Sequence, residues 1–172
     1  EEINVTTIED NAFADCTDLT SITIPASVTT IGDYAFARCY NLTSITIPAS
    51  VTTIGGYVFS DCKNLTSVTI PSGVTAIGDG AFSGCQSLTS ITIPFGVSTI
   101  GEEAFYHCSL SSIIIPSSVV AIGDCAFADC FELTSVTIPA SVTLFGKYVF
   151  LNCNHLTEVY ISSGITTIGD GA

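Results

Sequence analysis

Basic residues are scarce in this chain of 172 residues: three lysines and arginines stand against 16 aspartates and glutamates, for a formal net charge of −13. Such a charge repels the phosphates of nucleic acids and of anionic lipid surfaces. No apolar run approaches the roughly 18 residues that a membrane-spanning helix needs. The sequence therefore predicts no nucleic-acid partner and no membrane insertion of this segment.

Residues and motifs for catalysis are also scarce. His107 and His155 are the two histidines, and they occupy different positions of the repeat described below. The motifs of zinc proteases, phosphate loops and nucleophile elbows do not occur, nor do paired Cys-x-x-Cys sequences. No Asp-x-Asp-x-Asp loop is present to hold calcium. The sequence predicts a protein that is not an enzyme and that has no catalytic residue, metal or cofactor.

What the chain does contain is one motif of about 23 residues, repeated along its whole length. Successive prolines are 23 residues apart except for one step of 22, where a residue is missing between Cys108 and Leu110; these are Pro25, Pro48, Pro71, Pro94, Pro116 and Pro139, and Ser162 takes the seventh place. A fixed period of 20 to 50 residues predicts a solenoid, in which each coil is stabilised by stacking on its neighbours. We expect residues 1–172 to form a single solenoid domain of about seven repeats. Because the chain begins and ends inside a repeat, we expect it to be a segment of a longer array.

Each repeat contains two segments that favour strands. Residues 44–47 alternate polar and β-branched apolar side chains, which is typical of a half-buried strand that the following proline ends. Residues 51–54 predict a second short strand, closed by Gly55. The spacing of Phe59 and Cys62 suits one helical or 3₁₀ turn. Stacking would then give parallel sheets around inward columns of Ile, Val and Phe.

Cysteines and acidic residues form two further columns. Seven of the eight cysteines follow the phenylalanines by three residues, and we interpret them as reduced core residues, because parallel stacked side chains do not readily adopt disulfide geometry. Cys125 falls outside this column, so we expect it to be an accessible thiol. The acids after the Ile-Gly step should be solvated and favour solubility, with a calcium ladder as the alternative; they are Asp10, Asp33, Asp79, Glu102, Asp124 and Asp170.

The outward positions of the first strand form the candidate binding site. They are mostly serine and threonine, and Ile114, Glu158 and Tyr160 depart from this pattern, with Phe95 and Tyr106 flanking. One interpretation is that threonine suits a solvated strand through its β propensity. A solenoid surface can also bind protein or glycan, and a regular threonine array can order ice. The candidate residues are Ser44, Thr46, Ser67, Thr69, Ser90, Thr92, Ile114, Glu158 and Tyr160.

The repeat pattern Leu-x-x-Ile-x-Ile-Pro-x-x-Val-x-x-Ile-Gly-x-x-Ala-Phe-x-x-Cys, seen in residues 19–39 and 88–108, resembles the BspA-like class of leucine-rich repeats. The resemblance covers nearly the whole chain. It implies a right-handed, curved, mainly β solenoid with a concave parallel sheet and short second strands or 3₁₀ turns on the other side. Members occur in surface or secreted proteins of host-associated bacteria and protozoa.

The resemblance also implies a function. We expect a non-enzymatic, extracellular or cell-surface module that recognises a protein or glycan on a host or neighbouring cell. A structural spacer or self-associating rod is the alternative, and ice binding through the Ser/Thr columns is a third hypothesis. The family pattern contains no catalytic residue to carry over.

Overall fold

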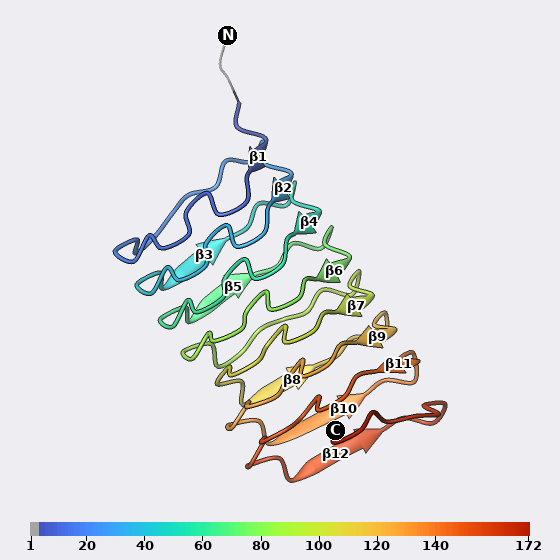
Figure 1. The fold of residues 1–172 in the computed structure, drawn as a ribbon. Helices are drawn as coiled ribbons and strands as arrows, with labels where there is room; N and C mark the ends of the chain where they lie inside the picture. The colour runs from blue at the N-terminus through green and yellow to red at the C-terminus, as the bar shows by residue number, and fades with distance from the viewer. Residues whose placement is uncertain (1–3) are drawn as a thin grey trace.

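The computed structural model describes residues 4–172, which form a parallel β-solenoid of about seven coils stacked along one axis. The coils that contain β1 and β12 lie at opposite ends of the stack (Figure 1). No helix occurs in residues 4–172. The predicted fold class, a solenoid of stacked repeats, is confirmed.

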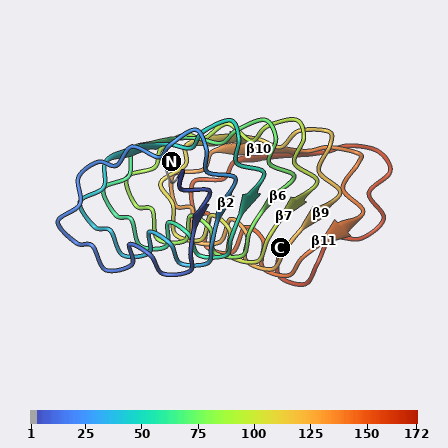
Figure 2. The same cartoon turned by 90° about the horizontal axis from the view of Figure 1, so that it is seen from above.

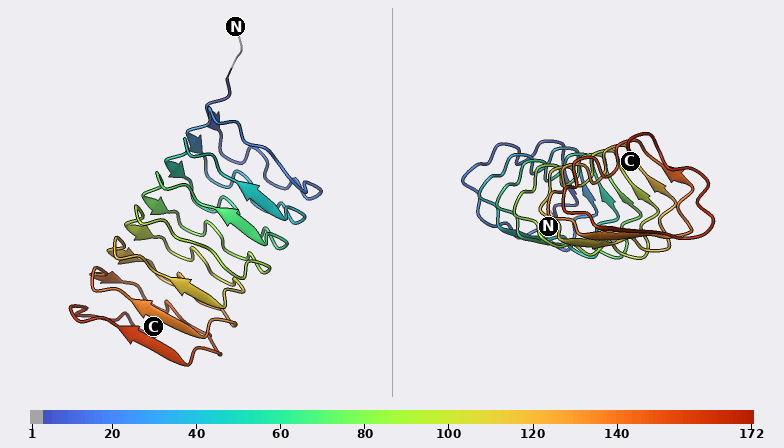
Figure 3. Two further views of the ribbon diagram at one scale, coloured as in Figure 1. Left: turned by 180° about the vertical axis from the view of Figure 1, so that it is seen from behind. Right: turned by 90° about the horizontal axis from the view of Figure 1, so that it is seen from below.

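Two sets of short strands lie on different sides of each coil (Figures 2 and 3). The first strands, which precede the prolines or, for β12, Ser162, are β3 (Ser44–Thr46), β5 (Ser67–Thr69), β8 (Ser112–Ile114), β10 (Ser135–Ile138) and β12 (Glu158–Ile161). The second strands are β1 (Thr7–Ile8), β2 (Thr30–Ile31), β4 (Thr53–Ile54), β6 (Ala76–Ile77), β7 (Thr99–Ile100), β9 (Ala121–Ile122) and β11 (Leu144–Phe145). Both predicted strands of the repeat are therefore present.

Strands pair in parallel with the strand one repeat away. Thr30 pairs with Thr53, and Ser135 pairs with Glu158, an offset of one full repeat. Across the short repeat the offset falls by one residue, so that Thr99 pairs with Ala121. The missing residue before Leu110 is absorbed in the loop, and the strand register is kept.

The segment between the second and first strands differs from the predicted helical turn. The Cys39 N–H donates to the Phe36 carbonyl over 3.3 Å, which is the spacing of a 3₁₀ turn, but Arg38 has a φ of 59°. A positive φ at the third residue defines a type II turn and excludes a 3₁₀ helix. Tyr34 also has a positive φ, of 55°. This geometry directs alternate N–H groups along the stack: the Phe36 N–H donates to the Val58 carbonyl over 2.9 Å. We call this part of each coil the turn side.

The core consists of columns that run the length of the stack. Rings of successive phenylalanines stack with centroids between 5.2 and 5.7 Å apart. Beside them, each buried cysteine thiol donates to the carbonyl of the phenylalanine in the preceding coil, as from Cys62 to Phe36 over 3.2 Å. Burial raises the pKa of these thiols, to about 11 for Cys39 and Cys153 and to about 12 for Cys62 and Cys130. The cysteine column is thus part of the core and of its hydrogen bonding.

Cys125 is different from this column. It is partly exposed, and its pKa is raised by partial burial and then by the nearby carboxylates of Glu103 and Asp124. The structure thus gives the expected accessible thiol, with a lowered tendency to ionise.

The acidic column does more than favour solubility. Its aspartates are exposed, but their Oδ1 atoms accept the N–H of the residue one repeat later over 2.7 to 2.8 Å; these are Asp10, Asp33, Asp79 and Asp124. The glycine before each donor residue permits this close approach: a Cβ on Gly32, which precedes the donor Asp33, would collide with Asp10 Oδ1 and lie 2.6 Å from the Asp10 nitrogen. The aspartates therefore connect neighbouring coils.

We expect the buried thiols to make stability depend on alkaline pH. Their pKa values are raised above the ordinary 9.0 in the folded chain. Their contribution is therefore fully present below about pH 9 and is lost as the pH rises towards about 12, because the unfolded chain ionises first. Urea unfolding under reducing conditions, followed by circular dichroism at pH 8 and pH 10.5, measures this loss.

Two variants isolate the cause of the alkaline loss. Cys85→Ala removes a buried thiol and should reduce the loss of unfolding free energy between the two pH values. Cys16→Ala removes an exposed thiol and should leave that loss unchanged. Equal pH dependence in both variants would contradict the prediction.

We expect Asp79→Ala to destabilise the solenoid by about 1 kcal/mol, because the Glu102 N–H loses its carboxylate acceptor. Asp79→Asn retains an oxygen acceptor and removes one charge from the acidic column, so its stability should stay close to that of the native chain. Urea midpoints of the two variants give the comparison. If both variants unfold alike, the hydrogen bond does not contribute as described.

Candidate functional site

The candidate residues lie together on the outward side of the first strands, which we call the first-strand face. All nine are exposed. Register brings them into columns across neighbouring coils: Ser44 lies beside Ser67, and Thr46 beside Thr69. The structure therefore places these side chains on one exposed face.

The three departures from the serine and threonine pattern lie near one end of this face. Ile114 pairs with Thr137, which pairs in turn with Tyr160, so that Thr137 separates the two apolar side chains. Ile114 is 83% exposed and Tyr160 is 57% exposed. The Tyr160 hydroxyl donates to Glu158 Oε2 over 3.1 Å, and this hydrogen bond raises the pKa of Tyr160. Thr137 therefore belongs to the site, because it lies between Ile114 and Tyr160. The sequence did not single it out, since threonine is the usual residue at this position of the repeat.

The face is less uniform than the sequence predicts. Residues 90–93 are extended but pair with neither neighbouring strand, so the sheet is divided into a β3–β5 part and a β8–β10–β12 part. Shallow hollows lie on both sides of this segment. One is lined by Ser67, Thr69, Ser90 and Thr92 among others, and the next by Ser90, Thr92, Ser112 and Ile114 among others.

The two flanking aromatic residues lie in different places. Phe95 is exposed at the corner after Pro94, close in sequence to the unpaired segment. Tyr106 lies on the turn side, where it contacts His107 edge to face with ring centroids 6.0 Å apart. Tyr106 therefore does not belong to the first-strand face.

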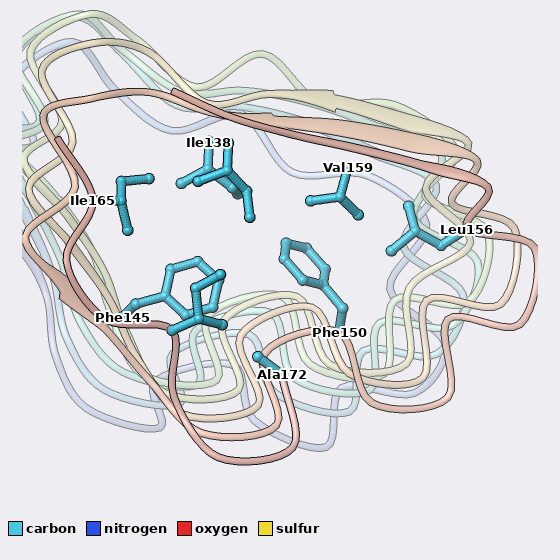
Figure 4. A pocket seen from close by; sticks show the side chains of 9 residues that line it. Ile138, Phe145, Phe150, Leu156, Val159, Ile165 and Ala172 are labelled. Carbon is cyan, nitrogen blue, oxygen red and sulfur yellow. The ribbon is translucent and has the colours of Figure 1, made fainter. Parts of the chain in front are cut away.

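A separate apolar cavity of about 170 Å³ opens at the last coil (Figure 4). Its lining contains no charged side chain and consists of residues that belong to the inward columns of the last two coils, namely Ile138, Phe145, Phe150, Leu156, Val159, Ile161, Ile165, Ile168 and Ala172. The cavity therefore lies at the end of the apolar core.

The chemistry for catalysis is limited in the described part of the chain. His155 Nδ1 lies 3.7 Å from Glu132 Oε2, and both side chains are exposed, while the His107 ring contacts Phe131. Among residues 4–172, no three His, Cys, Asp or Glu side chains gather as a metal site would require. Within the same residues, no helix has the length and hydropathy to cross a membrane.

Stacked coils with Leu-x-x-Ile-x-Ile first strands and a continuous apolar core define a leucine-rich-repeat protein. The chain belongs to the family described as the BspA type leucine rich repeat region, whose model matches residues 2–94 and 75–172 in six copies. Such repeats are in general protein-interaction modules, and the fold is typically a binding scaffold. No curated protein matches the chain.

Three solved structures illustrate the likeness. A leucine-rich-repeat protein of T. pallidum is 29% identical with a TM-score of 0.83, over 91% of this chain and 74% of that one. One from Bacteroides ovatus is 29% identical with a TM-score of 0.69, over 99% of this chain and 49% of that one. A leucine-rich cell surface protein of Faecalibacterium prausnitzii is 29% identical with a TM-score of 0.60, over 96% of this chain and 67% of that one.

Proposed function

We propose that this chain is a recognition module of a cell-surface or secreted protein, and that its first-strand face binds a protein or glycan on a host or neighbouring cell. The observation that carries the proposal is the exposure of Ile114, which is 83% exposed in a column that otherwise contains mainly threonine. An aliphatic side chain that a partner buries in a pocket can serve as the central anchor of an interface.

The charge distribution supports the same face. Glu158 is the one charged residue among the outward positions of the first strands, whereas the whole chain carries a net charge of −13. A partner can therefore approach this face with little electrostatic repulsion. Serine and threonine hydroxyls there both donate and accept hydrogen bonds, which suits peptide groups and sugar hydroxyls alike.

The relatives support the location. The solved F. prausnitzii structure is described as a leucine-rich cell surface protein. The match to this chain covers 67% of the length of that protein. We propose adhesion and a surface location for this chain by analogy with it. Ice binding is not favoured, because Ile114 and Tyr160 interrupt the threonine column and strand pairing is broken at residues 90–93.

We expect Ile114→Thr to reduce binding at least 10-fold while changing the free energy of unfolding by less than about 0.5 kcal/mol, because the side chain is mostly exposed. The assay measures binding of the folded chain to a glycan array, to immobilised matrix proteins and to whole cells. Leu144→Thr is the matched control: Leu144 is 67% exposed but lies on a second strand, so its loss should leave binding unchanged.

Two results would count against the first-strand face as the binding surface. One is that the folded native chain binds none of these probes. The other is that Ile114→Thr and Leu144→Thr reduce binding equally, which would indicate a general loss of surface apolarity.

Self-association is a second candidate function, and the apolar end of the last coil favours it. Val159, Ile161 and Ile168 are all partly exposed at this end, next to the cavity. The inward columns of the first coil could cover them in a second copy, which would extend the stack head to tail.

We expect the sedimentation coefficient to rise with concentration and Val159→Lys to suppress that rise, because the charge would have to be buried between copies. Val120→Lys provides the control: Val120 is 43% exposed against 45% for Val159, but it does not line the cavity. Monomers of the native chain at every concentration would exclude this association.

A further inference from the structure

One junction in the middle of the stack lacks hydrogen bonds that its neighbours have. Within the described residues, the N–H groups of Thr75, Gly78 and Thr89 donate to no backbone carbonyl of the preceding coil. Their equivalents one repeat earlier, Thr52, Gly55 and Thr66, donate to Thr29, Ile31 and Thr43 over 2.8 to 3.2 Å. We call this junction, between residues 52–70 and residues 75–93, the seam.

Strand pairing is interrupted on both strand-bearing sides of the seam. β4 does not pair with β6, and β5 does not pair with the extended residues 90–93. Elsewhere in the described chain, the second strands pair without another break from β1 to β4 and from β6 to β11. The one other place where second-strand bonds are missing is the incomplete last coil, which has a neighbour on one side only.

Contacts on the turn side of the seam are intact. The N–H groups of Tyr57, Phe59 and Asp61 donate across it to Asp79, Ala81 and Ser83 over 2.7 to 2.9 Å. The rings of Phe59 and Phe82 also remain stacked across it, with centroids 5.5 Å apart. The two coils thus keep their backbone hydrogen bonds on the turn side and lack them on the strand-bearing sides, although Gly78 still lies close to Gly55 there.

The sequence explains why the seam lies here. Gly56 occupies the position of the acidic column, so the Asp79 N–H has no carboxylate acceptor like the one that Asp33 gives to Gly56. Gly73 occupies the position from which Ser50 donates its hydroxyl to the Val28 carbonyl over 2.6 Å. Two side-chain connections are therefore missing at the same junction.

We propose that the seam is a hinge, about which residues 4–70 and 75–172 rotate with the turn-side hydrogen bonds as the pivot. Few hydrogen bonds must break for the strand-bearing sides to separate, so this junction should open at a lower free energy than the others. The hollow between Ser67, Thr69, Ser90 and Thr92 lies directly over it. Opening changes the spacing of the two parts of the first-strand face. The hinge depends only on the junction and stands whether or not that face binds a partner.

Amide hydrogen exchange and relaxation dispersion by NMR on the whole 172-residue chain test the hinge. The amides of Thr75, Gly78 and Thr89 should exchange at least 10-fold faster than those of Thr52, Gly55 and Thr66. The amides of Tyr57, Phe59 and Asp61 should remain as protected as their equivalents one repeat earlier. Residues on both sides of the seam should show microsecond-to-millisecond dispersion.

Gly56→Asp should close the hinge by restoring the missing acceptor. A Cβ at Gly56 would lie 3.4 Å from the Asp79 carbonyl oxygen and 3.8 Å from Asp33 Oδ1, so the side chain fits. We expect slower exchange of the Asp79 and Gly78 amides and reduced dispersion. Glu102→Asp is the control, since it places an aspartate in the same column at a junction whose strands are paired. It should not affect the seam.

Asp33→Gly is the reciprocal variant, because it removes the acceptor of the Gly56 N–H at an intact junction. It should increase exchange at Gly55 and Gly56 and leave the seam as it is. Three results would overturn the hinge. The native chain could show flat dispersion profiles, or the amides at the seam could be as protected as their equivalents one repeat earlier. The third result is that Gly56→Asp changes neither the exchange rates nor the dispersion. Rapid exchange at Tyr57, Phe59 and Asp61 would also overturn it, because the pivot would then be broken.

Discussion

Hydrogen bonding from each coil to the next is the constraint on which this structure depends. A short coil cannot bury its own apolar face or pair all its own backbone N–H and C=O groups. The adjacent coil must therefore cover that face and supply the hydrogen-bond partners. The strands do this in the ordinary parallel manner, while the turn side needs positive φ at residues such as Tyr34 and Arg38 to direct its N–H groups along the stack. The favourable contacts with the neighbouring coil offset the conformational cost of these residues.

Side chains extend the same scheme. The thiol of Cys62, the carboxylate of Asp33 and the hydroxyl of Ser50 all form hydrogen bonds to the backbone of a neighbouring coil. Three chemically different columns therefore have one role, which explains why polar and apolar positions recur with equal regularity. Where two of these connections are absent, at Gly56 and Gly73, strand pairing is absent as well. Local differences in sequence thus accompany differences in hydrogen bonding between the coils.

A regular scaffold leaves recognition to the positions that stacking does not use. The outward side chains of the first strands make few of the contacts between coils, so they can vary without loss of the fold. Ile114 and Tyr160 vary in this way and are largely exposed. The proposed binding role of the face and the hinge beneath its centre both follow from this separation between the columns that hold the coils and the columns that face outward.

The sequence by itself determined the solenoid, the two strands of each repeat and the inward columns, because a period of 23 residues repeats the same burial pattern at each step. It also placed Ser44, Thr46, Ile114 and their equivalents on one exposed face, since side chains alternate along a strand. Spacing alone could not distinguish a 3₁₀ turn from the type II turns at Phe36–Cys39, because both bring residues three apart together and the sign of φ at Arg38 depends on the next coil. Likewise, the sequence predicts Asp33 only as a solubilising residue, whereas in the structure its Oδ1 accepts the Gly56 N–H. Only the tertiary structure decided that residues 90–93 are unpaired. Strand pairing depends on how each coil is placed against its neighbours, and contacts between residues 23 apart set that placement.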